Sequence, residues 1–76
     1  MEMASRETPF GSVTLDYSGN GIYQINRRDY FGTVYHTDSA RSQVYALVVL
    51  AHAVQEEENR MKRELQRVVR GGSYAF

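Results

Sequence analysis

The sequence predicts an α+β fold in which a three-stranded antiparallel meander precedes one long helix, the order βββα, in a single domain over residues 1–76. Short runs of alternating and β-branched residues fill residues 10–36 and are separated by turn residues. Residues 39–70 contain neither Gly nor Pro and carry apolar residues at helical spacing. A chain of 76 residues is long enough for one domain.

The first strand of the predicted meander follows a polar segment. Residues 1–9 end in the only Pro, and we expect them to be disordered because they offer little apolar surface to bury. In the stretch SVTLDY, the apolar Val13, Leu15 and Tyr17 alternate with polar residues. This alternation is typical of a strand that buries one face.

Turn residues separate the next two strands. Asn20-Gly21 predicts a hairpin because both residue types can adopt positive φ angles. The stretch IYQINR then forms the second strand, and Arg28-Asp29 marks a tight turn. The third strand is YFGTVYH, which is rich in aromatic and β-branched residues.

The long helix is bounded by residues that start and stop helices. Asp38 or Ser39 is expected to be its N-cap, because a short side chain with an oxygen can accept from the free N–H groups of the first turn. Gly71-Gly72 is expected to end it. Residues 71–76 then form a short tail that contains two aromatic residues.

The helix is longer than the sheet that it accompanies. A strand of five or six residues spans roughly the length of eleven or twelve helical residues, so the sheet can cover Val44–Val54 but not Gln55–Arg70. A stripe with alternating spacings of three and four, broken by one charged residue, continues into the second half: Val44, Leu47, Ala51, Val54, Glu58, Met61, Leu65 and Val68. This surplus of apolar surface predicts a homodimer, and the candidate dimer residues are Val44, Val48, Val49, Ala51 and His52.

No motif for catalysis or metal binding stands out. His36 and Asp38 have the residue types of a general base and its carboxylate, or of two metal ligands, but no nucleophile or third ligand accompanies them. The segment Gly19-Asn20-Gly21 lies between two strands, whereas glycine-rich phosphate loops lead into a helix. We therefore expect no enzyme, no catalytic residues, no metal and no cofactor.

Aromatic residues on the strands, with arginines beside them, have two interpretations. Such a face can stack nucleotide bases, but a balanced charge of nine basic and nine acidic residues disfavours nucleic acid as the partner. Tyr and Arg are also enriched in protein-binding hot spots. The candidate partner-binding residues on the sheet and the second half of the helix are Tyr23, Arg27, Arg28, Tyr30, Tyr35, Met61, Arg63, Leu65 and Val68.

Composition also bears on location. The sequence has no Cys, which excludes disulfides and suits a reducing compartment. Met1–Phe10 lacks the apolar segment of a secretory signal, and the apolar run Val44–Val54 is too short to span a bilayer. We expect a cytoplasmic protein that does not enter the membrane, in the host cell if a phage encodes it.

Two protein families have a similar layout. A hairpin around GNG, a third strand and an amphipathic helix over residues 10–70 resemble small phage-encoded inhibitors of bacterial defence, anti-CRISPR proteins among them. The stretch LDYSGNGIYQI…FGTVYHTDSARSQVYALVVLAHAV is similar in order to the sheet-and-helix half of HicB-type antitoxins, although the acidic stretch before their helix is missing.

These resemblances give two expectations for function. The first implies a non-enzymatic interaction module that blocks a host defence complex by occupying its surface. The alternative is a HicB-like antitoxin, or a module that binds nucleotide or RNA through an aromatic sheet face. Binding of a protein client would separate the first expectation from the second.

Overall fold

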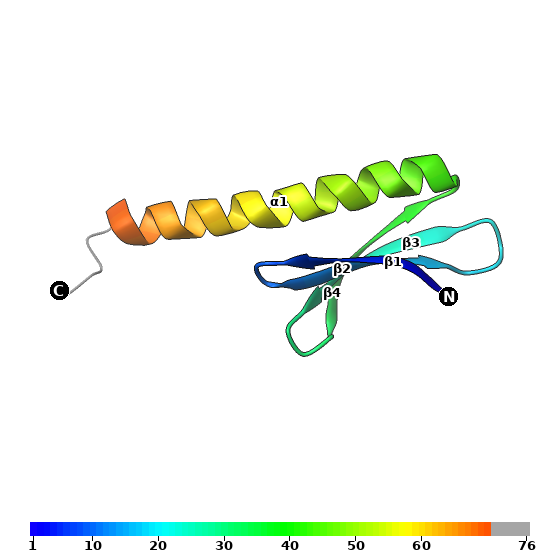
Figure 1. The fold of residues 1–76 in the computed structure, drawn as a ribbon, viewed down its shortest axis with the longest axis horizontal. Helices are drawn as coiled ribbons and strands as arrows, with labels where there is room; N and C mark the ends of the chain where they lie inside the picture. The colour runs from blue at the N-terminus through cyan, green and yellow to red at the C-terminus, as the bar shows by residue number, and fades with distance from the viewer. Residues whose placement is uncertain (71–76) are drawn as a thin grey trace.

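The computed structural model describes residues 1–70, which form one antiparallel sheet and one long helix (Figure 1). The α+β class is confirmed, but the sheet has four strands in the order β1-β2-β3-β4, so the prediction of three strands is wrong in that detail. The elements are β1 (Glu2–Thr8), β2 (Gly11–Tyr17), β3 (Tyr23–Asp29), β4 (Val34–Ala40) and α1 (Gln43–Arg70). The expectations for residues 71–76 lie outside the described residues.

The additional strand, β1, lies in the segment that was expected to be disordered. Its residues have low β-propensity and no apolar alternation, which is why the sequence pattern missed it. Backbone pairing with β2 holds it, in a register from Glu2 opposite Asp16 to Thr8 opposite Gly11. Ala4 also packs against the core. An edge strand can thus form from backbone hydrogen bonds and one small apolar contact.

The loop between β2 and β3 contains the predicted hairpin turn. Gly19 and Gly21 have φ angles of 91° and 74°, a region that Gly enters without a steric penalty. Within residues 1–70 the positive φ angles belong to glycines, so Asn20 does not adopt the conformation expected of it. Ser18 N–H donates to the carbonyl of Ile22 at 3.0 Å and closes the loop.

The turn between β3 and β4 falls later than predicted. The Asp29 carboxylate accepts from the backbone N–H groups of Phe31 and Thr33, both at 2.9 Å, and Gly32 has a φ angle of 83°. Tyr30 and Phe31 therefore belong to the turn, and the strand expected at residues 30–36 runs instead from Val34 to Ala40. The interaction of a side chain with the backbone two residues ahead moved this boundary.

The helix also begins later than predicted. Asp38 and Ser39 cannot be its N-cap because their backbone pairs with β3, opposite Ile25 and Gln24. Ser42 is the N-cap: its Oγ accepts from the N–H of Tyr45 at 3.1 Å. The range of residues 39–70 predicted for the helix is thus too long at its start, since α1 runs from Gln43 to Arg70.

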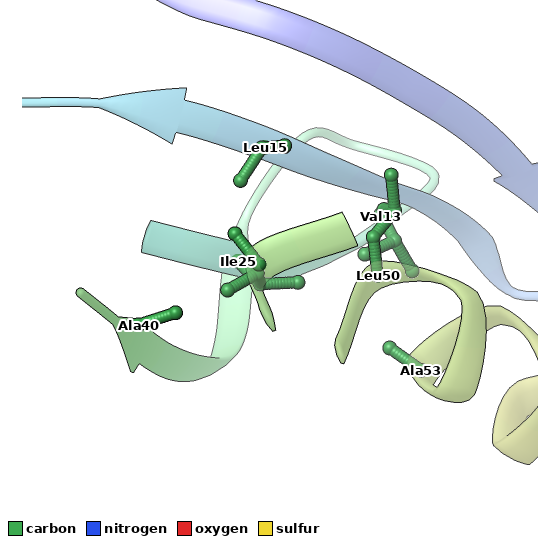
Figure 2. Packing of buried hydrophobic residues seen from close by; sticks show 7 residues of the cluster. Val13, Leu15, Ile25, Ala40, Leu50 and Ala53 are labelled. Carbon is green, nitrogen blue, oxygen red and sulfur yellow. The ribbon is translucent and has the colours of Figure 1, made fainter. Parts of the chain in front are cut away.

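The core lies between the sheet and the first half of α1. Val13, Leu15 and Ile25 are fully buried on the face of β2 and β3 that points to the helix. Figure 2 shows these side chains gathered with those of the helix. The buried helix residues recur every three or four positions and define the inner stripe of α1: Ala46, Leu50, Ala53 and Glu57. Two alanines in this stripe allow the helix to approach the sheet closely.

The opposite side of α1 is uncovered. We name it the outer stripe, and it consists of Val44, Val48, Ala51, Gln55, Glu58, Lys62, Leu65 and Val69, all exposed. The exposed fractions of its four largest apolar residues are 75% for Val44, 58% for Val48, 54% for Leu65 and 63% for Val69. Figure 1 shows that the C-terminal part of the helix projects past the sheet, as its length predicted.

The face of the sheet that points away from α1 carries polar side chains. The hydroxyl of Thr37 donates to Asn26 Oδ1 at 2.8 Å, and Asn26 Nδ2 donates to Asp16 Oδ2 at 3.1 Å. Thr14 and Asn26 are buried, although no helix covers them, because neighbouring strands surround them. Hydrogen bonds across the central strands satisfy these groups.

Candidate functional site

A buried carboxylate marks the point where the helix leaves the sheet. Glu57 lies on the inner stripe, and its exposed fraction is 2%. Three donors from different elements reach it: Arg27 Nη1 on β3 at 3.0 Å, the hydroxyl of Tyr35 on β4 at 2.7 Å, and Arg60 Nη1 on α1 at 3.0 Å. A buried carboxylate with several charged and neutral donors can stay in the folded protein without a large desolvation penalty.

Arg27 joins this carboxylate to a second one. Its Nη2 lies 2.6 Å from Glu56 Oε1, so one guanidinium bridges two neighbouring helix residues. Burial lowers the pKa of Arg27, but hydrogen bonds to Glu56 and Glu57 outweigh that effect and the pKa is raised. The hydrogen bond from Arg27 in turn lowers the pKa of Glu56. Both ions therefore keep their charges over a wide pH range.

Tyr35 and Arg60 complete the cluster. Burial, followed by the hydrogen bond to Glu57, raises the pKa of the Tyr35 hydroxyl. The Arg60 guanidinium carbon lies 3.6 Å from the centre of the Phe10 ring and 5.8 Å from that of Tyr35, which are cation–π contacts. We name this set the clamp: Phe10, Arg27, Tyr35, Glu56, Glu57 and Arg60. It attaches α1 to β3, to β4 and to the turn before β2, so its first role is to fix the helix on the sheet.

A cleft adjoins the clamp between β4 and α1. Its volume is about 410 Å³, and its lining residues are Arg27, His36, Asp38, Ser39, Tyr45, Val49, His52 and Glu56. His36 Nε2 lies 3.2 Å from Asp38 Oδ2, and His52 Nε2 lies 3.8 Å from Glu56 Oε1. These side chains are exposed to solvent and can exchange hydrogen bonds with a polar group of a partner. Residues 1–70 contain no group of three or more His, Asp or Glu side chains that could hold a metal ion.

The structure separates the predicted partner-binding residues on the sheet into different places. Arg27 and Tyr35 direct their polar atoms into the clamp. Tyr23 packs against the core, with its ring centre 4.8 Å from that of Tyr17. Arg28 donates to the Thr14 hydroxyl at 3.3 Å and to the Gly32 carbonyl at 3.0 Å. These arginines and tyrosines therefore do not form one continuous aromatic surface.

Tyr30 has a different position, at the tip of the β3–β4 turn. Its exposed fraction is 78%, and that of the neighbouring Phe31 is 94%. The Tyr30 hydroxyl donates to the carbonyl of Pro9, which ties this tip to the β1–β2 turn. Phe31 was part of the aromatic pattern of the predicted third strand but was not among the predicted site residues. We name Tyr30 and Phe31 the hairpin tip.

The predicted residues on the helix fall on two sides. Leu65 lies on the outer stripe, Arg63 is exposed on the side of the helix away from that stripe, and Met61 and Val68 are half-buried. Among the candidate dimer residues, Val44, Val48 and Ala51 lie on the outer stripe and His52 is exposed next to it, whereas Val49 packs against the core. Most of the candidate dimer residues thus share one accessible face.

Glu57 was missed by the sequence prediction, which named Glu58 as the charged residue in the apolar stripe. A signal for it existed, because Ala46, Leu50, Ala53 and position 57 continue one helical face. Arg27, its partner, follows Val13, Leu15 and Ile25 on the inner face of the sheet by strand alternation. A charged residue at an inward position on both elements indicates a buried ion pair.

Comparisons with protein-family models, with curated proteins and with solved structures find no match for this chain. In the part of the chain that the structure describes, α1 has no apolar stretch long enough to cross a membrane. Function is therefore inferred from three features of the molecule itself: the outer stripe, the hairpin tip and the cleft beside the clamp.

Proposed function

We propose that the protein is a non-enzymatic protein-binding module: a homodimer that inhibits a bacterial defence complex by occupying its surface in the host cytoplasm. The single observation that carries this proposal is the amount of exposed apolar surface on a small, well-defined fold. Large apolar side chains stand uncovered at both ends of the outer stripe and again at the hairpin tip. Contiguous exposed apolar patches are typical of interaction sites in proteins of this size.

The hairpin tip has the features of a client-binding surface. Tyr30 and Phe31 are large and aromatic, as are many interface anchors. The Asp29 carboxylate holds the backbone of this turn through two hydrogen bonds, and the Tyr30 hydroxyl is bonded to Pro9. Because the turn is held in one conformation, little conformational entropy is lost when Phe31 enters a pocket on a partner.

The clamp supports binding indirectly, because it fixes the position of the helix on the sheet. It uses the polar atoms of Arg27 and Tyr35 within the protein, so these two residues orient the helix and the sheet relative to each other. Exposed polar groups at the neighbouring cleft, including His36 and Asp38, can provide hydrogen bonds at the rim of an interface. In this arrangement the outer stripe serves self-association and the hairpin tip contacts the client.

The alternative of an aromatic nucleotide-binding sheet receives less support from the geometry. Thr14, Asp16 and Asn26 occupy the centre of the sheet face that points away from the helix. Tyr17 and Tyr23 stack against each other on the helix side. Base-stacking sheets present rings on their open face beside basic residues, so we do not propose a second function.

A plasmid-survival assay tests the proposed function. Bacteria with an RNA-guided nuclease that destroys a challenge plasmid would express the wild-type protein, Phe31→Ser or Met3→Ser. The wild-type protein should raise plasmid survival, and Phe31→Ser should abolish the effect. Met3→Ser alters an exposed apolar residue on β1 and should remain active.

Affinity capture gives the second readout for the same variants. A nuclease subunit should be retained by the wild-type protein and by Met3→Ser, and lost with Phe31→Ser. Equal survival with and without the protein across a panel of such defence systems, together with no retained subunit, would contradict the proposal. Co-purified RNA or nucleotide would favour the antitoxin-like alternative instead.

A further inference from the structure

The outer stripe of α1 has a symmetric pattern, and we infer that it pairs with the outer stripe of a second copy in antiparallel order. The inference rests on the proposed homodimer and specifies its geometry. The two helices lie back to back, with a two-fold axis between residues 56 and 57, and each sheet covers the far side of its own helix. The projecting half of the helix is then part of the dimer interface and not a client-binding surface.

The positions of the two stripes make this arrangement sterically possible. An α-helix turns about 100° per residue, so Ala46 lies about 200° from both Val44 and Val48. The same offset separates Ala53 from Ala51 and Gln55. The inner stripe on the sheet and the outer stripe are therefore on opposite sides of α1. A second helix can contact the outer stripe along its full length without displacing the sheet.

The residues of the outer stripe match in reverse order. The spacing of the stripe alternates between four and three, which is the spacing of a two-helix interface. If residue i of one copy faces residue 113 − i of the other, apolar ends meet and polar centres meet. The facing pairs are Val44 with Val69, Val48 with Leu65, Ala51 with Lys62, and Gln55 with Glu58.

The positions beside the stripe follow the same rule. In the antiparallel order, Leu47 of one copy lies next to Val68 of the second copy, and Val54 lies next to Met61 of the second copy. Leu47 is exposed, and the other three are half-buried in the single chain. The pairing therefore covers apolar surface on one flank as well as at both ends. Two-fold symmetry makes every contact occur twice.

Charge favours the antiparallel order over the parallel one. Parallel helices in register would place Glu58 against Glu58 and Lys62 against Lys62, and like charges that face each other are destabilising. In the antiparallel order the Gln55 amide can donate to Glu58. The stem of Lys62 can cover Ala51 while its ammonium group reaches solvent.

The charge distribution along the whole helix also favours the antiparallel order. The helix is basic towards its C-terminus, at Arg60, Lys62, Arg63, Arg67 and Arg70, whereas Gln43–Val54 contains no Asp, Glu, Lys or Arg. Antiparallel pairing brings the basic half of one copy against this uncharged half of the other. Parallel pairing brings the two basic halves together. Antiparallel helix dipoles also attract each other.

The length of the helix fits this interface. Its 28 residues extend about 42 Å, and full overlap is required for Val44 to reach Val69 of the second copy. A helix that served only to cover the sheet would need no residues after the clamp. The length beyond Glu57 is thus accounted for by the second copy, whose uncharged half it covers.

Disulfide cross-linking tests the order directly, because the chain has no Cys of its own. In the antiparallel dimer, two Val48 residues are about 25 Å apart along the helix axis, whereas a disulfide needs Cα atoms within about 7 Å. Val48→Cys alone and Leu65→Cys alone should therefore not cross-link under mild oxidation. An equimolar mixture of the two, and the double variant Val48→Cys/Leu65→Cys, should give covalent dimers.

Each outcome of the cross-linking decides the inference. Efficient cross-linking of either single variant would show a parallel dimer and overturn the inference, while leaving the proposed protein-binding function intact. No cross-linking in the mixture, with a light-scattering mass of 8.7 kDa at tens of micromolar, would overturn both the inference and the homodimer. If such a monomer were active in the plasmid-survival assay, client binding would not depend on dimerisation.

A charge variant supplies an independent test of the same surface. Leu65→Glu places a carboxylate opposite Val48 and should weaken dimerisation about 100-fold or more, because burial of an unpaired charge costs several kcal/mol. Arg63→Glu, also exposed but on the side of the helix away from the stripe, should change the dimerisation constant by less than about threefold. Similar constants for Leu65→Glu and the wild-type protein would contradict the pairing.

Discussion

The inner and outer stripes of α1 differ in the kinds of residue that they contain. The inner stripe, which the sheet covers, contains two alanines, one leucine and one glutamate. The outer stripe, which is uncovered, contains Val44, Val48, Leu65 and Val69. A helix that only had to cover a sheet would place its larger apolar side chains inward. The inner stripe thus combines close approach to the sheet with ion pairing, whereas the outer stripe leaves apolar surface exposed, as the proposed dimer requires.

The largest expected effect is at the charged end of the inner stripe. Glu57→Ala removes the acceptor of Arg27, Tyr35 and Arg60, and it should lower the free energy of unfolding by about 3–5 kcal/mol, as measured by urea denaturation. The double variant Arg27→Met/Glu57→Leu should be close to the wild-type stability, because it removes both buried charges together. A single variant as stable as the wild-type protein would mean that the clamp does not hold the helix.

The apolar part of the inner stripe should give the next largest effect. Leu50→Ala leaves a cavity beside Val13 and should cost about 2–4 kcal/mol in urea denaturation. The matched change on the outer stripe is Leu65→Ala. At concentrations low enough for the protein to be monomeric, it should alter stability by less than about 0.5 kcal/mol. Equal costs at these two positions would remove the distinction between the stripes.

A smaller effect is expected where both stripes begin. Ser42→Ala removes the side-chain acceptor for the Tyr45 N–H and should lower the free energy of unfolding by about 1 kcal/mol. Ser39→Ala is the control, since Ser39 was one of the two residues that the sequence suggested for the cap but lies in β4. A larger loss for Ser39→Ala than for Ser42→Ala would place the N-cap where the sequence suggested.

The smallest expected effect is on the pH dependence of stability, and it comes from Tyr35, which is bonded to Glu57 on the inner stripe. The folded protein raises the pKa of Tyr35 above its ordinary value of 10.0, so the unfolded chain loses this proton first as pH rises. The stabilising contribution is complete below pH 10 and is lost as pH increases above that value. Melting temperatures between pH 8 and 11 should fall less steeply for Tyr35→Phe than for the wild-type protein. Parallel curves would exclude a role of this hydroxyl in alkaline unfolding.

The parts of the fold that could be predicted are those with a periodic pattern. The alternation of Val13, Leu15 and Tyr17 predicted β2, and the absence of Gly and Pro over residues 39–70 predicted the long helix α1. β1 could not be predicted, because the backbone of β2 holds it and its own side chains do not. The late start of α1 depends on pairing between β4 and β3, which no local pattern reveals.

The candidate site was predictable only in part. Helix spacing predicted a stripe that shares Val44, Ala51, Glu58 and Leu65 with the exposed outer stripe, but its other members, Leu47, Val54, Met61 and Val68, lie beside the outer stripe. The spacing places Arg27 and Glu57 at inward positions, but it does not pair them, because they are distant in sequence and each also has an ordinary surface interpretation. The hairpin tip could not be predicted, because the Asp29 side chain stabilises a turn where the sequence pattern indicated a strand.

The end of the buried stripe at Glu57 has a consequence for hydrogen exchange along α1. In a single chain, the amides of residues 61–70 can exchange through fraying of the free end, while those of residues 46–57 are protected by the sheet. In the antiparallel dimer, the free end of each helix lies on the part of the other helix that the sheet already holds. Exchange at residues 61–70 would then slow as protein concentration rises. The exchange rate in the projecting half of the helix would therefore measure dimer formation.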